Sequence, residues 1–162
     1  MVIGNSCTLE ISKLIIVNMP ALVAVIVAVV VACISYQQYK LSKDKFRLDL
    51  FEKRFSIYKG VQRFLTHILI NGKVYLDKSD EFRRDTQDAI FLFGDEIPNY
   101  LDIIDKKALD MWATTEQYKD LPVGKERSSL VSQESILLKE LIAELPRLRE
   151  VFSPYLKFDK WK

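Results

Sequence analysis

An uninterrupted apolar segment near the N-terminus constrains this chain more than any other feature. Residues 14–34 (LIIVNMPALVAVIVAVVVACI) are 21 consecutive positions without a charged side chain. As an α-helix, a segment of this length crosses the roughly 30 Å hydrocarbon core of a bilayer. We therefore interpret residues 14–35 as a transmembrane helix. Residues 1–13 then form a short tail with little fixed structure on one side, and residues 36–162 form one body on the other.

The charges beside this segment predict its orientation. Only Lys13 precedes it closely, whereas a basic cluster follows it. The more basic flank of a transmembrane helix stays in the cytoplasm, where its cations also contact lipid headgroups. We expect the tail outside and the body inside, and the membrane-proximal basic residues are Lys40, Lys43, Lys45 and Arg47.

Processing and redox state follow from a few residues. A cleavable signal also has an apolar core, and residues 30–33 (VVAC) resemble a lipoprotein cleavage box, so both processed forms stay open as alternatives. Glu10 and the lack of an early basic cluster favour a retained helix. Cys7 and Cys33 are the two cysteines, and neither lies in the body, which fits a reducing compartment.

The body reads as all-helical, with glycine and proline marking the breaks. We expect the membrane helix to continue to residue 71 before Gly72, followed by helices over 79–93, 95–119 and 125–153. Ser79 and Asp95 are the expected N-caps, and Pro146 is expected to kink or divide the last helix. No segment reads as a strand. The predicted fold is an N-terminal transmembrane helix that continues into a cytoplasmic four-helix bundle.

The helical spacing of residues 36–70 predicts two kinds of surface. Near the membrane a narrow apolar seam includes Leu41, Leu48 and Phe55, which suits packing between subunits. Farther along, the apolar arc widens as in the core helix of a domain. The alternative is that the chain's own helices cover both parts.

The chemistry-bearing residues are sparse. The chain has one histidine, His67, and it lacks phosphate-binding glycine loops and a Gly-x-Ser-x-Gly turn. We therefore expect no enzyme activity, no metal and no cofactor. With a net charge of only +2, we also do not expect a nucleic-acid partner.

One pair of side chains suggests a speculative RNA contact. Arg63 and His67 stand four residues apart on one helix face, where arginine can hold phosphate and histidine can move a proton. The alternative is a solvated pair. The acidic residues Glu81, Asp85 and Asp88 could in principle hold a divalent ion, although such a spacing is typical of a solvated face.

Three segments carry a resemblance to known proteins: 45–55 (KFRLDLFEKRF), 91–101 (FLFGDEIPNYL) and 152–156 (FSPYL). With the single N-terminal span, they resemble a widespread group of short, uncharacterised bacterial membrane proteins. This resemblance implies a cytoplasmic helical body at the bacterial inner membrane.

The chain also resembles the small accessory membrane protein of type VI-B CRISPR systems, which joins one N-terminal span to a reduced HEPN-like helical body. That family is associated with ring-like membrane assemblies that strengthen phage defence. In HEPN ribonucleases four to six residues, one of them polar, separate arginine from histidine. Only three separate Arg63 from His67 here, and neither an asparagine nor a second histidine follows.

The sequence thus predicts an oligomeric membrane protein that acts as a defence accessory or effector and alters permeability. One apolar helix cannot make an aqueous pore alone, so a pore requires a ring of subunits. The residues expected to pack or line its centre are Asn18, Ala21, Ala24, Ala28 and Ala32. The alternatives are a tether for a cytoplasmic partner and a ribonuclease that uses Arg63 and His67.

Overall fold

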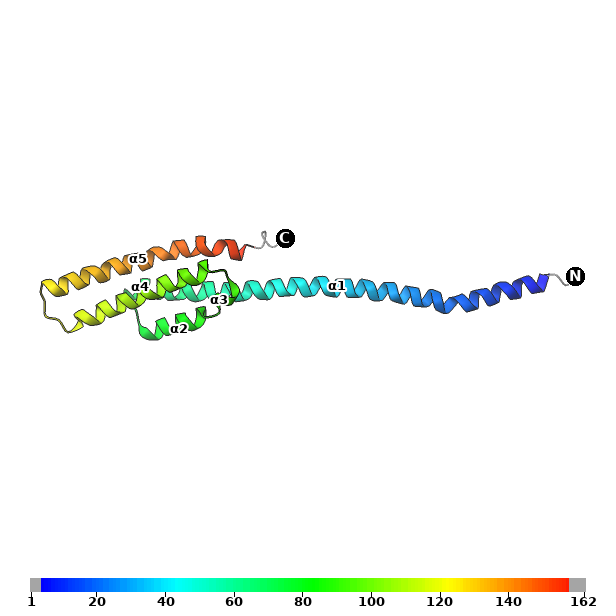
Figure 1. Cartoon of the computed structure of the whole chain (residues 1–162), viewed down its shortest axis with the longest axis horizontal. Coiled ribbons are helices and arrows are strands. Elements are labelled where there is room, and N and C mark those ends of the chain that lie inside the picture. The colour runs from blue at the N-terminus through cyan, green and yellow to red at the C-terminus, as the bar shows by residue number, and fades with distance from the viewer. Residues whose placement is uncertain (1–3, 158–162) are drawn as a thin grey trace. The chain divides into compact units, whose positions relative to one another are not determined.

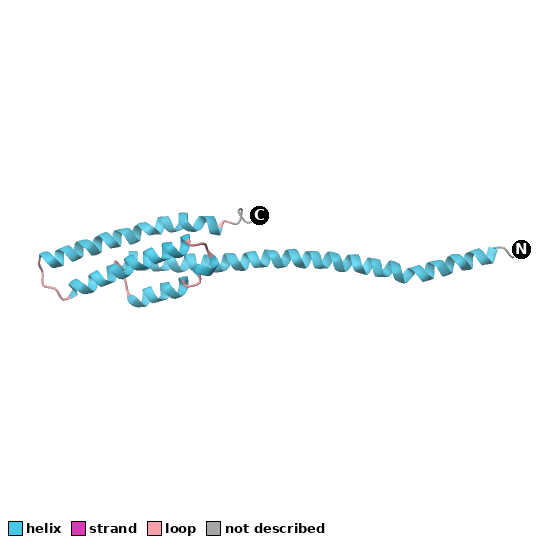
Figure 2. Ribbon diagram, in the orientation of Figure 1, coloured by secondary structure: helices cyan, strands magenta, loops and turns pink. Residues whose placement is uncertain are grey.

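The structure is a computed structural model that describes the backbone of residues 4–157 and the side chains of residue 19 and residues 22–157. Figure 2 shows helices joined by short loops, with no strand in the described backbone. The all-helical prediction is therefore confirmed. The elements are α1 (Gly4–Asn71), α2 (Leu76–Thr86), α3 (Ala89–Leu92), α4 (Glu96–Lys119) and α5 (Lys125–Leu156).

The chain divides into two units, Met1–Leu48 and Asp49–Lys162. In the first unit the structure describes the N-terminal part of α1. This helix is long and apolar enough to cross a membrane, and none of the described residues in its most apolar stretch is buried. Because α1 begins at Gly4, the expectation that residues 4–13 have little fixed structure was wrong. Extending an existing helix costs less than starting a new one, and no proline separates Gly4 from the apolar segment.

The second unit has a core of its own, to which the end of α1 contributes one face. Its buried residues recur at helical spacing and confirm the broad apolar arc: Ile57, Val61, Phe64, Leu65 and Ile68. In contrast, Leu41 is 71% exposed and Leu48 is 47% exposed. The helices of the second unit therefore cover the second part of the predicted surface.

The remainder of the core comes mainly from α4 and α5, which lie side by side (Figure 1). Apolar residues at helical spacing on both helices are fully buried, and burying each of those larger than alanine stabilises the fold by about 1.5–3 kcal/mol. These residues are Ile97, Ile104, Ala108 and Met111 on α4 and Leu141, Leu148 and Phe152 on α5. The bundle of α1, α2, α4 and α5, with α3 as a single extra turn, matches the predicted four-helix body.

Two of the predicted breaks are confirmed. Gly72 has a φ of +62°, which glycine adopts without strain, and its N–H donates 2.8 Å to the carbonyl oxygen of Ile68 to close α1. Gly124 precedes α5 as predicted. Pro146 does not divide α5, which continues to Leu156 beyond the predicted end at residue 153.

The start of the second helix was predicted wrongly. Ser79 is not an N-cap, because α2 already begins at Leu76 and the Ser79 N–H donates 3.0 Å to the Tyr75 carbonyl. Ser79 is fully buried instead. The single helix expected over 79–93 is also two helices, α2 and α3, separated by a turn at Gln87–Asp88. Asp95 precedes α4 as predicted, but its side chain makes no capping hydrogen bond.

Candidate functional site

The apolar surface of α1 in the first unit is the first candidate site. From Leu22 to Ile34 every side chain is exposed, and Ala24, Ala28 and Ala32 recur every fourth residue along one face. The side chains of Asn18 and Ala21 lie outside the described part of the chain. A helix surface of this kind, left uncovered by its own chain, can be shielded by lipid or by other helices.

The basic segment that follows is equally open. Lys40, Lys43 and Lys45 are exposed and Arg47 is half-buried. Within the described side chains, none of the four forms an ion pair with a carboxylate. Three aromatic side chains lie among them with about 70% of their surface exposed: Tyr36, Tyr39 and Phe46.

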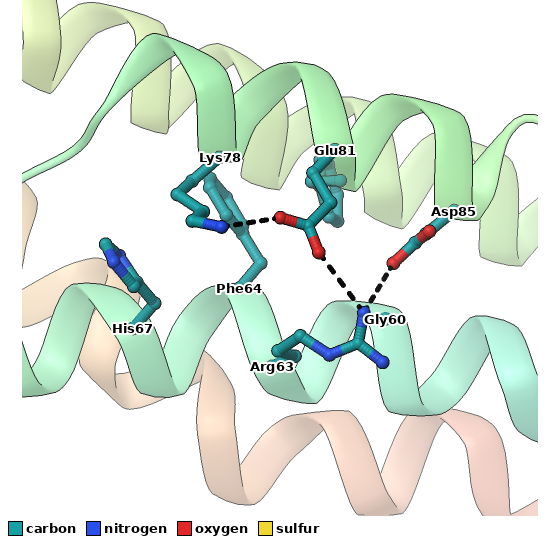
Figure 3. Close-up of a pocket in the computed structure, with 8 residues that line it drawn as sticks. Gly60, Arg63, Phe64, His67, Lys78, Glu81 and Asp85 are labelled. Carbon is teal, nitrogen blue, oxygen red and sulfur yellow. Dashed lines mark hydrogen bonds and ion pairs between the residues drawn. The ribbon is translucent and has the colours of Figure 1, made fainter.

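In the second unit, Arg63 and His67 line one small pocket of about 150 Å³ between α1 and α2. Figure 3 shows Arg63 reaching across to α2, while His67 lies one turn farther along α1. Arg63 Nη1 is 3.4 Å from Glu81 Oε1 and 3.2 Å from Asp85 Oδ2. Arg63 and His67 therefore share a pocket but point to different partners.

This arrangement bears on both hypotheses about the pocket, an RNA contact and a site for a divalent ion. Two carboxylates already balance the positive charges of Arg63 and Lys78, so the pocket offers no excess charge to attract phosphate. Glu81 and Asp85 are likewise committed to Arg63, and Asp88 lies outside α2. Among the described residues, no group of histidine, cysteine, aspartate and glutamate side chains can hold a metal ion.

His67 is held by ring packing. Its ring meets Tyr75 edge-on, with centroids 5.5 Å apart, and its Nδ1 is buried without a hydrogen-bond partner among the described residues. On the other side of the pocket Lys78 Nζ donates 2.7 Å to Glu81 Oε2, and this bond lowers the pKa of Glu81 below its usual value. The pocket thus serves to hold α2 on α1.

Close approach of α2 to α1 depends on a glycine. A Cβ atom at Gly60 would lie 2.8 Å from the Cβ of Asp85, which is closer than two carbon atoms pack. Gly60 is buried, so the two backbones meet where the Arg63 ion pairs form. Its role was missed because a glycine within an apolar helical pattern indicates a close contact but not the partner.

A second polar cluster joins α4 to α5 around a buried carboxylate. Glu144 is 4% exposed, and its Oε1 lies 3.4 Å from Lys107 Nζ and 3.6 Å from Arg147 Nη1. The Tyr100 hydroxyl donates 3.4 Å to the carbonyl oxygen of Glu144. Burial, and then the charge of Glu144, raise the pKa of Tyr100. A buried carboxylate that keeps two cationic partners fixes how α4 and α5 align.

A third cluster fixes α3. Arg54 Nε donates 2.9 Å to the carbonyl oxygen of Leu92, and its guanidinium lies over the rings of Phe93 and Tyr155. Ala89 and Phe93 face the core, which leaves Ile90 and Phe91 outside with 66% and 84% of their surface exposed.

Comparison with protein-family models, curated proteins and solved structures returned no match for the chain.

Proposed function

We propose that this protein is a single-pass membrane protein that self-associates and alters membrane permeability, as an accessory or effector in antiphage defence. The single observation that carries the proposal is the apolar part of α1, in which no described side chain is buried. Such a surface is stable only in lipid or against other helices. The small side chains of Ala24, Ala28 and Ala32 allow the helices of two copies to approach closely.

The location proposed for each part follows the flanking charges. The α1 segment would cross the bacterial inner membrane, with the N-terminus outside and the bundle in the cytoplasm. Membrane lipid and further copies of the chain are the proposed partners, together with a protein of the same defence system. A reporter fused after Lys162 should be active in the cytoplasm only. A protein that stays soluble after cell fractionation would contradict this location.

Self-association is tested by the mass of the protein in detergent. The chain is 18.8 kDa, so light scattering with the detergent contribution subtracted should give a multiple of that mass. A monomer at working concentration would exclude a pore, since one helix cannot enclose water. Expression should depolarise cells and reduce plaque formation by phage, whereas a form that lacks residues 1–35 should do neither.

A second function, a membrane tether for a cytoplasmic partner, is supported by a groove on the bundle. The groove is about 450 Å³ in volume and is lined by aromatic side chains and by cations from three segments. Among its residues are Tyr75, Trp112, Tyr118, Lys73 and Arg127. Under this function the detergent-solubilised protein is monomeric and does not depolarise cells, so the same two measurements separate the two functions.

A further inference from the structure

The corner of the bundle at α3 carries exposed apolar side chains within a run of acidic residues. From Asp85 to Asp105 the chain has six acidic residues and no lysine, arginine or histidine. Asp85 and Asp105 pair with arginines of the bundle, and Glu96 accepts a hydrogen bond from Tyr155. Among the described residues, the other three acids of this run form no ion pair. We call these and the two apolar residues between them the acidic corner: Asp88, Ile90, Phe91, Asp95 and Asp102.

The acidic corner has a groove that can receive a side chain from a partner. Ile90 and Asp102 line a groove of about 300 Å³, together with apolar side chains that include Pro98 and Leu101. Arg83 also lines it, and its charge is balanced by ion pairs with Asp80 and Asp105. Phe91, which follows Ile90 in the sequence, is among the most exposed apolar residues of the described chain, at 84%. Because Arg54 fixes α3 through Leu92, the exposed side chains are presented by a rigid turn. An apolar patch rimmed by charge is typical of a protein contact site.

The basic segment of α1 has the complementary composition. At 3.6 residues per turn, six of its residues fall within an arc of about 120° on one face of the helix. This face is opposite the seam of Leu41 and Leu48 and is separate from it. We call the six residues the basic stripe: Tyr36, Tyr39, Lys40, Lys43, Phe46 and Arg47. Its three aromatic side chains are about 70% exposed.

We infer that the acidic corner of one copy docks on the basic stripe of a second copy. Aromatic side chains of the stripe enter the groove beside Ile90, while Lys40, Lys43 and Arg47 meet the three unpaired aspartates. Opposite charges around an apolar centre select this partner and align it. The inference rests on the proposed function and adds to it the surfaces that join neighbouring subunits.

The two surfaces differ, and this determines the kind of assembly. A contact between unlike patches is heterologous, so each copy uses its corner on one neighbour and offers its stripe to another. Repetition of such a contact closes a ring or extends a filament, whereas a contact between identical seams stops at a symmetric pair. A ring is the arrangement that a pore of single helices requires.

Charge reversal tests the contact in the full chain in nonionic detergent. One variant carries Asp88→Lys, Asp95→Lys and Asp102→Lys, and the other carries Lys40→Glu, Lys43→Glu and Arg47→Glu. Each alone should associate at least tenfold more weakly than the wild type, while a mixture of the two, or all six changes in one chain, should restore the wild-type mass. Unchanged helix content by circular dichroism shows that each variant is folded.

The same variants separate this inference from its competitors. Wild-type mass for the aspartate variant would show that copies meet through α1 alone, which overturns the inference and leaves the proposed function standing. The variant with Lys40→Glu, Lys43→Glu and Arg47→Glu is the second case. If mixing it with the aspartate variant does not restore association, the basic stripe contacts lipid headgroups instead, and the inference is overturned. A monomeric wild type would overturn both.

Cross-linking provides a second measurement. In a chain with Cys7 and Cys33 changed to serine, Phe46→Cys and Phe91→Cys are placed in different copies. Oxidation of the mixture should link two chains, and Phe46→Cys mixed with Val123→Cys should not link, although Val123 is 93% exposed. A chain that carries both cysteines and links to itself would show a contact within one copy and would overturn the inference.

Discussion

Arg54 Nε donates a 2.9 Å hydrogen bond to the carbonyl oxygen of Leu92, across 38 residues of sequence, and so fixes α3 against α1. The guanidinium also stacks over Phe93 at 5.5 Å, and burial lowers its pKa. Arg54→Ala leaves the Leu92 carbonyl without this donor and should lower the free energy of unfolding by about 2 kcal/mol. Urea unfolding of the full chain in nonionic detergent measures this loss. The exposed neighbour Lys53→Ala should change it by less than about 0.5 kcal/mol, and an equal effect of both changes would refute the role of Arg54.

Gly60→Ala should destabilise the bundle although alanine favours helices. The propensity gain is up to about 1 kcal/mol, whereas overpacking against a fixed neighbour costs about 1–3 kcal/mol. The neighbour here is Asp85 Cβ, which cannot move without its helix. We expect a net loss of about 1 kcal/mol in the same unfolding measurement. The matched control is Gly94→Ala, because a Cβ there meets no atom within 4 Å; a stable Gly60→Ala would show that α1 and α2 are not in close contact.

Lys107→Ala should weaken the joint between α4 and α5. Lys107 Nζ lies 3.2 Å from Glu140 Oε2 and 3.4 Å from Glu144 Oε1, and its removal leaves the buried Glu144 carboxylate with less compensation. Loss of one partner from a largely buried pair is expected to cost about 2 kcal/mol here, since Arg147 remains. The control is the exposed neighbour Lys106→Ala. Adding Glu144→Gln to Lys107→Ala should recover part of the loss, and the absence of any recovery would argue against an electrostatic origin.

The lowered pKa of Glu81 predicts that the bundle loses stability at acid pH. Its pKa is below the usual value of 4.5, first because Lys78 donates a hydrogen bond to it. A group whose folded pKa is depressed contributes stability above its unfolded pKa and loses that contribution as pH falls through the folded pKa. The difference in unfolding free energy between the wild type and Glu81→Gln should therefore shrink below pH 4.5. A constant difference for Glu81→Gln down to pH 3 would contradict the linkage.

Ala28→Leu should weaken self-association in detergent. A larger side chain in the middle of the small-residue face separates two helices that pack there, and we expect association to fall at least tenfold. Val27→Leu adds one carbon on a different face of the same turn and is the control. Analytical ultracentrifugation of both variants gives the comparison. Equal association of the two variants would show that the alanine face is not the contact.

The sequence predicted the helices better than the contacts between them. Gly72 and Gly124 were recognisable because glycine at the end of an apolar period has a local meaning. The N-terminus of α2 was missed because Ser79 has the chemistry of a cap, yet tertiary packing buries it within the helix. The turn at Gln87–Asp88 carries neither glycine nor proline, so no local signal divided α2 from α3.

The candidate sites show the same limit. Arg63 and His67 share a helix face as predicted, but the carboxylates that occupy Arg63 come from α2, which a pattern within one helix cannot reveal. Glu144 could have been found, because it lies three residues after Leu141 and four before Leu148 on the apolar face of α5. Its cation on α4 could not have been identified without the fold.

Release of a trapped dye from vesicles that contain the purified full chain tests the central claim most directly. If several copies form one opening, the release rate should rise more steeply than in proportion to the protein content of the membrane. The Ala28→Leu variant, incorporated to the same level, should release dye at least tenfold more slowly. Vesicles that hold the wild-type protein and retain the dye at every protein content would contradict the claim that this protein alters membrane permeability.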